Sequence, residues 1–209
     1  MSDAVRLGLA WSGPSNVSAT SAATRLLASD PSINLSIFTG VAGPADRTLC
    51  QWDLVLAHAE VQNDMDARPL FPRFTLPALN QDRLQQQQAW FDWPRNALQE
   101  AYDAGEFDGF AWPSSGLIAK GDHFIGDIAI LQTLRDDLPG LRAGDMEGAT
   151  VAQQVTGQES VLWLVLGVIC DGASEAAAQS FEDFLKRYEQ QAWRLIAALL
   201  QRCNDTPQR

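Results

Sequence analysis

The sequence contains few of the residues that build metal sites or disulfide frameworks. Its 209 residues include only three cysteines and two histidines. Cys50, Cys170 and Cys203 stand far apart, and no C-x-x-C pair or cysteine–histidine cluster occurs. This pattern argues against a structural zinc site or a disulfide-based fold, so we expect no metal; the function read from the motifs described below implies no organic cofactor either.

Signals for export or membrane insertion are also missing. Residues 1–4 carry no basic stretch followed by an apolar run, as a secretory signal would. The longest apolar run, residues 161–170, is too short to cross a bilayer. We therefore expect a cytoplasmic protein that does not bind membranes.

Basic residues are scarce relative to acidic ones. Fifteen lysines and arginines stand against 26 aspartates and glutamates, which gives a formal net charge of −11. Phosphate backbones repel such a chain, so nucleic acid is not expected as a partner. Apolar residues make up 46% of the sequence, enough for the core of one domain that spans residues 1–209.

Hydrophobic periodicity predicts strands that alternate with helices. Strands are expected at 5–11, 35–39, 53–57, 107–112, 117–119 and 161–170, and helices at 17–28, 81–102, 128–135, 147–155 and from Ser180 to about 199. Ser180 and Asp183 form a capping box at the start of the last helix. Between residues 60 and 80 the periodicity disappears and three prolines occur, which indicates a functional loop or an interface. The alternation predicts an α/β layered domain.

Three glycine-containing segments follow predicted strands, where open α/β sheets place their sites. Residues 39–43 (T-G-V-A-G), taken alone, favour an ordinary tight turn. In residues 144–148 (G-D-M-E-G), Asp145 and Glu147 suit the hydroxyls of a sugar, but they also suit the N-terminus of a helix. Asp171, at the end of an apolar strand, suits a general acid or simply caps a turn.

The order and spacing of these segments resemble those of a known family. The motifs are T-G-V-A-G at 39–43, N-D-M-D-A at 63–67, G-L-I-A-K-G-D-H-F-I at 116–125, D-M-E-G-A at 145–149 and C-D-G-A at 170–173. Over residues 5–200 the chain resembles the 5′-methylthioadenosine/S-adenosylhomocysteine nucleosidases of the purine nucleoside phosphorylase superfamily. The resemblance implies a three-layer αβα domain with a central mixed sheet. It also implies hydrolysis of the N-glycosidic bond of a purine nucleoside.

The resemblance also implies roles for single residues. Asp171 matches the acid that protonates the leaving adenine, and Glu147 matches the carboxylate that binds the ribose hydroxyls. The other substrate-binding positions that match are Val41, Ala42, Gly43, Phe124, Ile125, Asp145, Met146 and Phe181. The loop at 60–80 matches a segment that enters the partner's pocket in a homodimer.

Some family features have no counterpart in this chain. Family members open with a strand and a helix whose glutamate activates water, and the chain offers only Asp122, Glu60 or Asp64 as substitutes. Gly167, Cys170 and Val41 replace a family arginine and two serines. We therefore expect weakened hydrolysis.

Two alternatives remain open. One is a protein that binds a nucleoside without catalysis. The other is phosphorolysis, because S-G-P-S at residues 12–15 is similar to a phosphate-binding turn of phosphorylases.

Overall fold

The computed structural model describes residues 5–86, 88–107, 109–123, 128–158, 161–170 and 177–202. Within these ranges the chain forms one mixed sheet of six strands. The strands are β1 (Leu35–Pro44), β2 (Leu54–Gln62), β3 (Leu84–Gln85), β4 (Pro113–Lys120), β5 (Leu141–Asp145) and β6 (Leu162–Ile169). Their order is β3-β2-β4-β5-β1-β6, and β2 also pairs with β6. All the strands except β3 therefore close into a ring.

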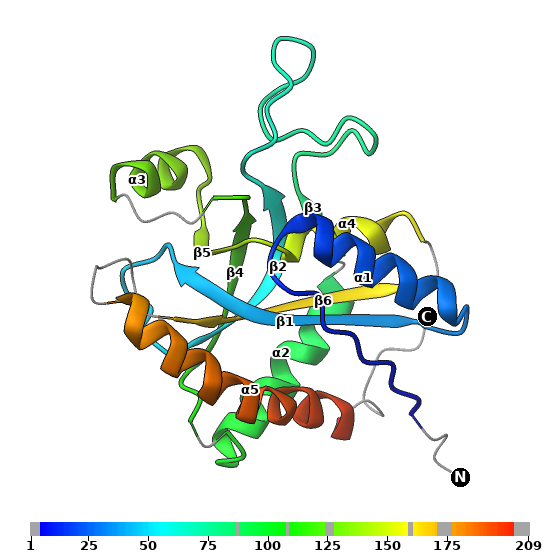
Figure 1. Ribbon diagram of the computed structural model, residues 1–209, viewed down its shortest axis with the longest axis vertical. Helices are drawn as coiled ribbons and strands as arrows, with labels where there is room; N and C mark the ends of the chain where they lie inside the picture. The colour runs from blue at the N-terminus through cyan, green and yellow to red at the C-terminus, as the bar shows by residue number, and fades with distance from the viewer. Residues whose placement is uncertain are drawn as a thin grey trace.

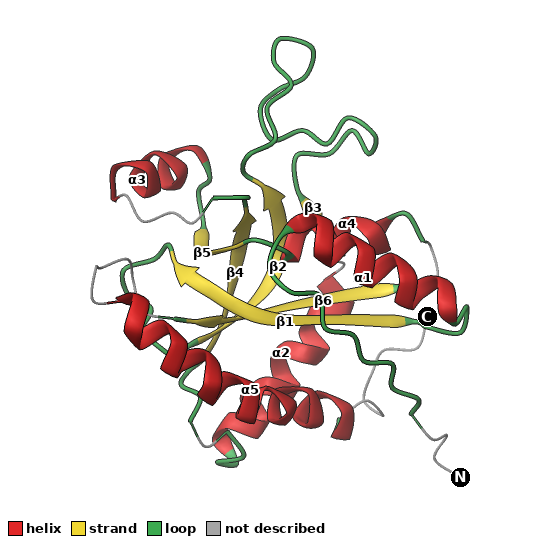
Figure 2. Ribbon diagram, in the orientation of Figure 1, coloured by secondary structure: helices red, strands yellow, loops and turns green. Residues whose placement is uncertain are grey.

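Helices cover both faces of the sheet. They are α1 (Asn16–Ser29), α2 (Gln88–Asp103), α3 (Ile128–Asp137), α4 (Gly148–Thr156) and α5 (Ala177–Gln201). α4 packs on one face with α1 outside it, whereas α2 and α5 lie together on the other face (Figures 1 and 2). The expected three-layer αβα fold with a central mixed sheet is confirmed.

β2 shows how the two faces are filled. Leu54 and Leu56 belong to the apolar cluster that includes α2 and α5, while Val55 and Ala57 belong to the cluster that includes α4. Successive side chains of a strand point to opposite faces, so residues 54–57, which are covered on both sides, are all apolar. β6 is apolar for the same reason, as the sequence predicted.

The strand predicted at residues 5–11 is wrong. Residues 5–13 have no regular secondary structure, and Leu9 and Trp11 are 90% and 81% exposed. Alternating apolar residues form a strand only when a neighbouring strand takes their backbone hydrogen bonds. No described strand pairs with this segment.

The glycine-rich turn predicted after residue 39 is also wrong. β1 continues through Gly40 to Pro44 and pairs with β6 in parallel from Leu35 to Ala42. Pairing of this length overrides the local preference of glycine for turns.

Other element boundaries move by several residues. β2 continues to Gln62 instead of ending near residue 57, and β4 begins only at Pro113. α2 begins at Gln88, after the short strand β3. α5 begins at Ala177, so Ser180 lies inside the helix and is not its N-cap.

The proline-rich loop after β2 projects from the body of the molecule (Figure 1). Leu70 within it is 83% exposed. No helix in the described part of the chain is long and apolar enough to cross a membrane.

Candidate functional site

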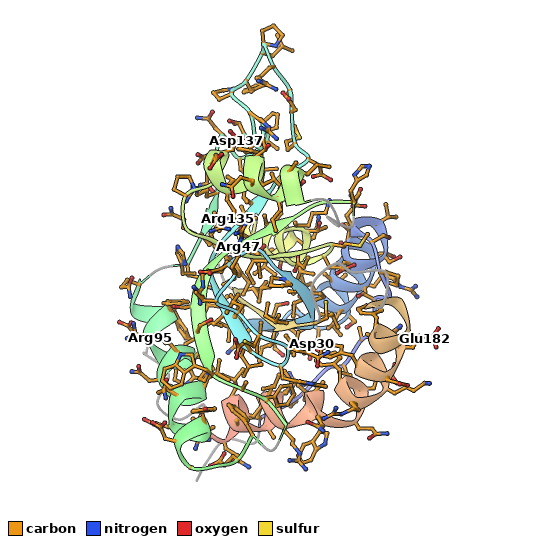
Figure 3. All side chains as sticks on the ribbon, turned by 90° about the vertical axis from the view of Figure 1, so that its left-hand side faces the viewer. Asp30, Arg47, Arg95, Arg135, Asp137 and Glu182 are labelled. Carbon is orange, nitrogen blue, oxygen red and sulfur yellow. The ribbon has the colours of Figure 1, made fainter. Side chains whose placement is uncertain are left out.

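A cavity of about 1960 Å³ runs along β1. Its walls come from α1, the middle of α3, the end of β5, α5 and the irregular segment before α1. Figure 3 labels three charged residues that line the cavity: Arg135 of α3 and Arg47 after β1 lie above Asp30 in this view. One part of the cavity reaches the carboxyl ends of β1, β5 and β6, at Gly43, Asp145 and Cys170, and α/β sheets bind ligands at such ends.

The structure brings together most of the described site residues that the sequence predicted. Those on the cavity wall are Val41, Gly43, Asp145, Met146, Glu147 and Phe181. Ala42 is different, because its side chain is buried in the apolar cluster beside α4. The alternation of β1 sends Ala42 to the opposite face from its two neighbours, so it is not part of the wall. Phe124, Ile125 and Asp171 lie outside the described residues.

Glu147 occupies the turn between β5 and α4. Its Oε1 accepts a hydrogen bond from the backbone N–H of Ser15 at 2.7 Å. Burial raises the pKa of Glu147, while the amides of Ser15 and Met146 and the charge of Lys120 lower it. The carboxylate is thus half-buried on the cavity wall and held by an amide from a distant segment.

Asp145 stabilises the same turn between β5 and α4. Its Oδ2 accepts a hydrogen bond from the backbone N–H of Gly148 at 3.0 Å, at the start of α4. Burial first, and then the charge of Glu147, raise the pKa of Asp145 to about 7. Asp145 therefore orders the residues that carry Glu147.

A buried lysine organises the neighbouring carboxylates. Lys120 Nζ lies 3.3 Å from Asp64 Oδ2 and 3.0 Å from Asp122 Oδ1. Asp122 Oδ2 also accepts a hydrogen bond from Asn16 Nδ2 at 2.8 Å. These contacts engage Asp64 and Asp122 as partners of the ammonium group.

None of the three carboxylates considered for orienting water lies on the described cavity wall. Asp64 and Asp122 surround Lys120, and Glu60 is fully buried in β2. Besides Asp145 and Glu147, the acidic residues of the wall within the described part of the chain are Asp30 and Glu189.

Sequence reasoning missed one polar contact of the wall. Thr39 Oγ1 on β1 and Tyr188 OH on α5 form a hydrogen bond of 2.9 Å. Burial raises the pKa of Tyr188 to about 12, so the phenol stays protonated. Tyr188 follows the apolar periodicity of its helix, which predicts a core residue and gives no sign of its hydrogen bond.

Close packing explains why this chain has glycine at position 167, where the family has an arginine. It lies in the middle of β6, opposite Gly40 of β1. A Cβ at this position would lie 2.9 Å from the Cβ of Ala42, which is closer than real Cβ contacts. The site therefore has no room for a side chain at 167.

Comparison with known proteins agrees with this architecture. The family model described as "Phosphorylase superfamily" matches residues 4–201. A 5′-methylthioadenosine/S-adenosylhomocysteine nucleosidase of Glaesserella parasuis is 29% identical over 189 residues, covering 89% of this chain and 78% of its own. The nucleosidase of Geobacillus kaustophilus is 30% identical over 165 residues, covering 78% and 66%.

Solved structures show the same fold. A nucleosidase of the same name from Neisseria meningitidis, in complex with methylthio-immucillin-A, superposes with a TM-score of 0.78 at 24% identity and covers 92% of this chain and 79% of its own. The futalosine hydrolase of Helicobacter pylori superposes with a TM-score of 0.77 at 24% identity, covering 91% and 77%. The match of the family model over nearly the whole chain, together with this shared fold, establishes that the chain belongs to the phosphorylase superfamily.

Proposed function

We propose that the protein hydrolyses the N-glycosidic bond of a purine nucleoside of the methylthioadenosine or adenosylhomocysteine type. The observation that carries the proposal is the position of Glu147 on the cavity wall, held by the amide of Ser15. A carboxylate fixed in this way accepts hydrogen bonds from the two vicinal hydroxyls of a ribose. Met146, beside it on the wall, packs against the sugar ring. Relatives at 29–30% identity carry the name of this activity, which supports the proposal.

The acid of the reaction is Asp171. It follows Cys170, which lies on the cavity wall directly after β6. Adenine leaves as a neutral base only when its ring receives a proton, so an acid near the base lowers the barrier to bond cleavage. The position after a buried strand suits this role because a poorly solvated carboxyl retains its proton.

Charge near the sugar favours a cationic transition state. Glu147 lies close enough to Asp122 and Lys120 for their charges to change its pKa. Lys120 is itself paired with Asp64 and Asp122, so the carboxylates outnumber the cation. A net negative environment stabilises positive charge that develops on the ribose as the bond to adenine breaks.

The same charges disfavour phosphorolysis at the turn of residues 12–15. The amide of Ser15, which a phosphate would need, donates to Glu147. Phosphorolysis remains testable because two arginines that could bind a phosphate, Arg47 and Arg135, line the cavity.

The decisive experiment measures adenine released from methylthioadenosine, with and without inorganic phosphate. We expect free adenine and free methylthioribose at a rate that does not depend on phosphate. The rate should be low, about 100-fold below that of a full acid–base pair, because none of the three substitutes for the family glutamate lies on the described wall. A phosphate-dependent sugar phosphate would establish phosphorolysis. Nucleoside binding without adenine release would establish a binding protein.

The projecting loop after β2 supports a homodimer. Exposed apolar residues such as Leu70 are unfavourable in water and suit a partner subunit. We also place the protein in the cytoplasm, as the sequence predicts.

A further inference from the structure

Glu60 is a buried acidic residue that the proposed reaction does not use. It lies near the end of β2, opposite Leu84 of β3 and Ile118 of β4. The residue is 0% exposed, and neither carboxylate oxygen has a hydrogen-bond partner among the described residues. A buried carboxyl without partners costs free energy, so its presence requires an explanation.

The carboxyl groups of Glu60 and Asp145 both lie close to Gly148. A Cβ built on Gly148 would be 2.4 Å from Asp145 Oδ2 and 3.0 Å from Glu60 Oε1. The two groups therefore converge on the same point at the start of α4. Asp145 Oδ1 is also buried without a described partner.

Two negative charges cannot both persist here. The surroundings of the two carboxyl groups are apolar. Val165 of β6 also lies beside Gly148, and Glu60 is paired with Leu84 on β3 and Ile118 on β4. The charged groups nearby are Asp145 itself, Glu147 and Lys120 with its partners Asp64 and Asp122. Burial first, and then the charge of Asp145, raise the pKa of Glu60 well above its usual range. Glu60 thus keeps its proton when Asp145 has lost its own.

We propose that Glu60 is a positioning residue for sugar recognition, a protonated carboxyl that donates a hydrogen bond to Asp145. This bond gives one unpartnered oxygen of Glu60 a partner at the point where Asp145 Oδ2 also lies. Asp145 in turn accepts the amide of Gly148 and fixes the turn that carries Glu147. The role in sugar recognition rests on the proposed function, whereas the proton on Glu60 does not.

The test compares Glu60→Leu with Glu60→Gln. Leucine removes the donor, so KM for methylthioadenosine should rise about tenfold with kcat unchanged within a factor of two. Glutamine still donates through its amide, so KM should return to near the wild-type value. Glu100→Leu, on the exposed surface of α2, is the matched control and should leave KM unchanged.

Stability separates this role from a merely structural one. An apolar side chain in place of a buried carboxyl is expected to leave the unfolding midpoint unchanged or to raise it. A raised KM in a Glu60→Leu protein that is no less stable than the wild type therefore supports a positioning role for Glu60. A wild-type KM in Glu60→Leu, or an equal loss in both Glu60 variants, would overturn it.

Infrared spectroscopy tests the proton without any reaction. At about pH 8, where exposed carboxyls are ionised, the wild type should show the carbonyl band of protonated carboxyl groups, and in Glu60→Gln this band should lose the part that Glu60 contributes, even where Asp171 keeps its proton. If the wild type releases no adenine, the proposed function fails while this band still supports the proton on Glu60. Absence of the band from the wild type would overturn the inference.

Discussion

Ser15 and Glu147 are 132 residues apart in the chain, yet the backbone N–H of Ser15 donates to Glu147 Oε1 at 2.7 Å. Ser15 is the N-cap of α1 and adopts a positive φ of 99°, which is uncommon for a residue other than glycine. The contact ties the start of α1 to the turn before α4. The carboxylate is therefore oriented before any sugar binds, which reduces the entropy lost on binding.

Glu147→Gln should weaken nucleoside binding much more than adenine binding. Each hydrogen bond to the charged carboxylate contributes roughly 1.5–3 kcal/mol, and the amide replaces it with a weaker one. Titration calorimetry with a nucleoside and with adenine measures both affinities. Asp136→Asn, on the exposed surface of α3, is the control and should change neither. Equal losses for both ligands in Glu147→Gln would show that this residue does not hold the sugar.

Asp171→Asn should lower the rate of adenine release by about 10²–10⁴, because asparagine has the shape of aspartate but no acidic proton. Nucleoside affinity should fall only modestly. Single-turnover kinetics and equilibrium binding separate the two effects. Turnover at the wild-type rate would rule out Asp171 as the acid.

Asp145 should make stability fall as pH rises. Its folded pKa of about 7 lies above the usual 3.8, so the folded state holds the proton more tightly than the unfolded state. The stabilisation is complete below about pH 4 and is lost as pH rises towards 7, by up to about 4 kcal/mol. Urea unfolding of wild type and Asp145→Asn across this window measures it. The variant should show a flatter pH dependence, and identical curves would contradict the assignment.

Gly167→Ala should destabilise the fold by about 1–3 kcal/mol, because the new methyl group would overlap the Cβ of Ala42. Gly157→Ala is the matched control. Gly157 has a helical φ of −74° and open space around it, so alanine should be tolerated. Thermal unfolding of both variants checks the difference, and equal midpoints would mean that β6 shifts to admit the side chain.

Leu70→Asp should convert the proposed homodimer into a monomer. A charge on the exposed loop after β2 would be costly to bury against a partner subunit. Light scattering after size-exclusion chromatography measures the mass, and Thr133→Asp, on the exposed surface of α3, is the control. A monomeric wild type would exclude the dimer.

The layers of the fold were predictable because β6 and α4 carry patterns that local sequence determines. The predictions of secondary structure failed where pairing with distant segments of the chain determines the structure. Residues 5–11 alternate like a strand, but none of the described strands pairs with them, and Gly40 looks like a turn but pairs with Gly167.

The site was predictable to a similar extent. Glu147 and Met146 were identified from their motif, and both line the cavity. The partners of Glu147 and of Tyr188 were not, because Ser15 and Thr39 come from segments far away in the chain. No local pattern encodes such contacts.

The ring of strands has one short junction, between β1 and β5. β1 meets β6 along eight residue pairs but meets β5 only at Gly43–Gly144 and Pro44–Ala143, next to the amides of Ala45 and Asp46 that donate to Arg142. Local opening in a protein begins where the fewest hydrogen bonds must break. Gly43 and Gly144 both line the cavity, so the junction of the ring with the fewest paired residues is also a wall of the binding site. Thermal separation of β1 from β5 would therefore widen the cavity and admit a ligand without unfolding the core.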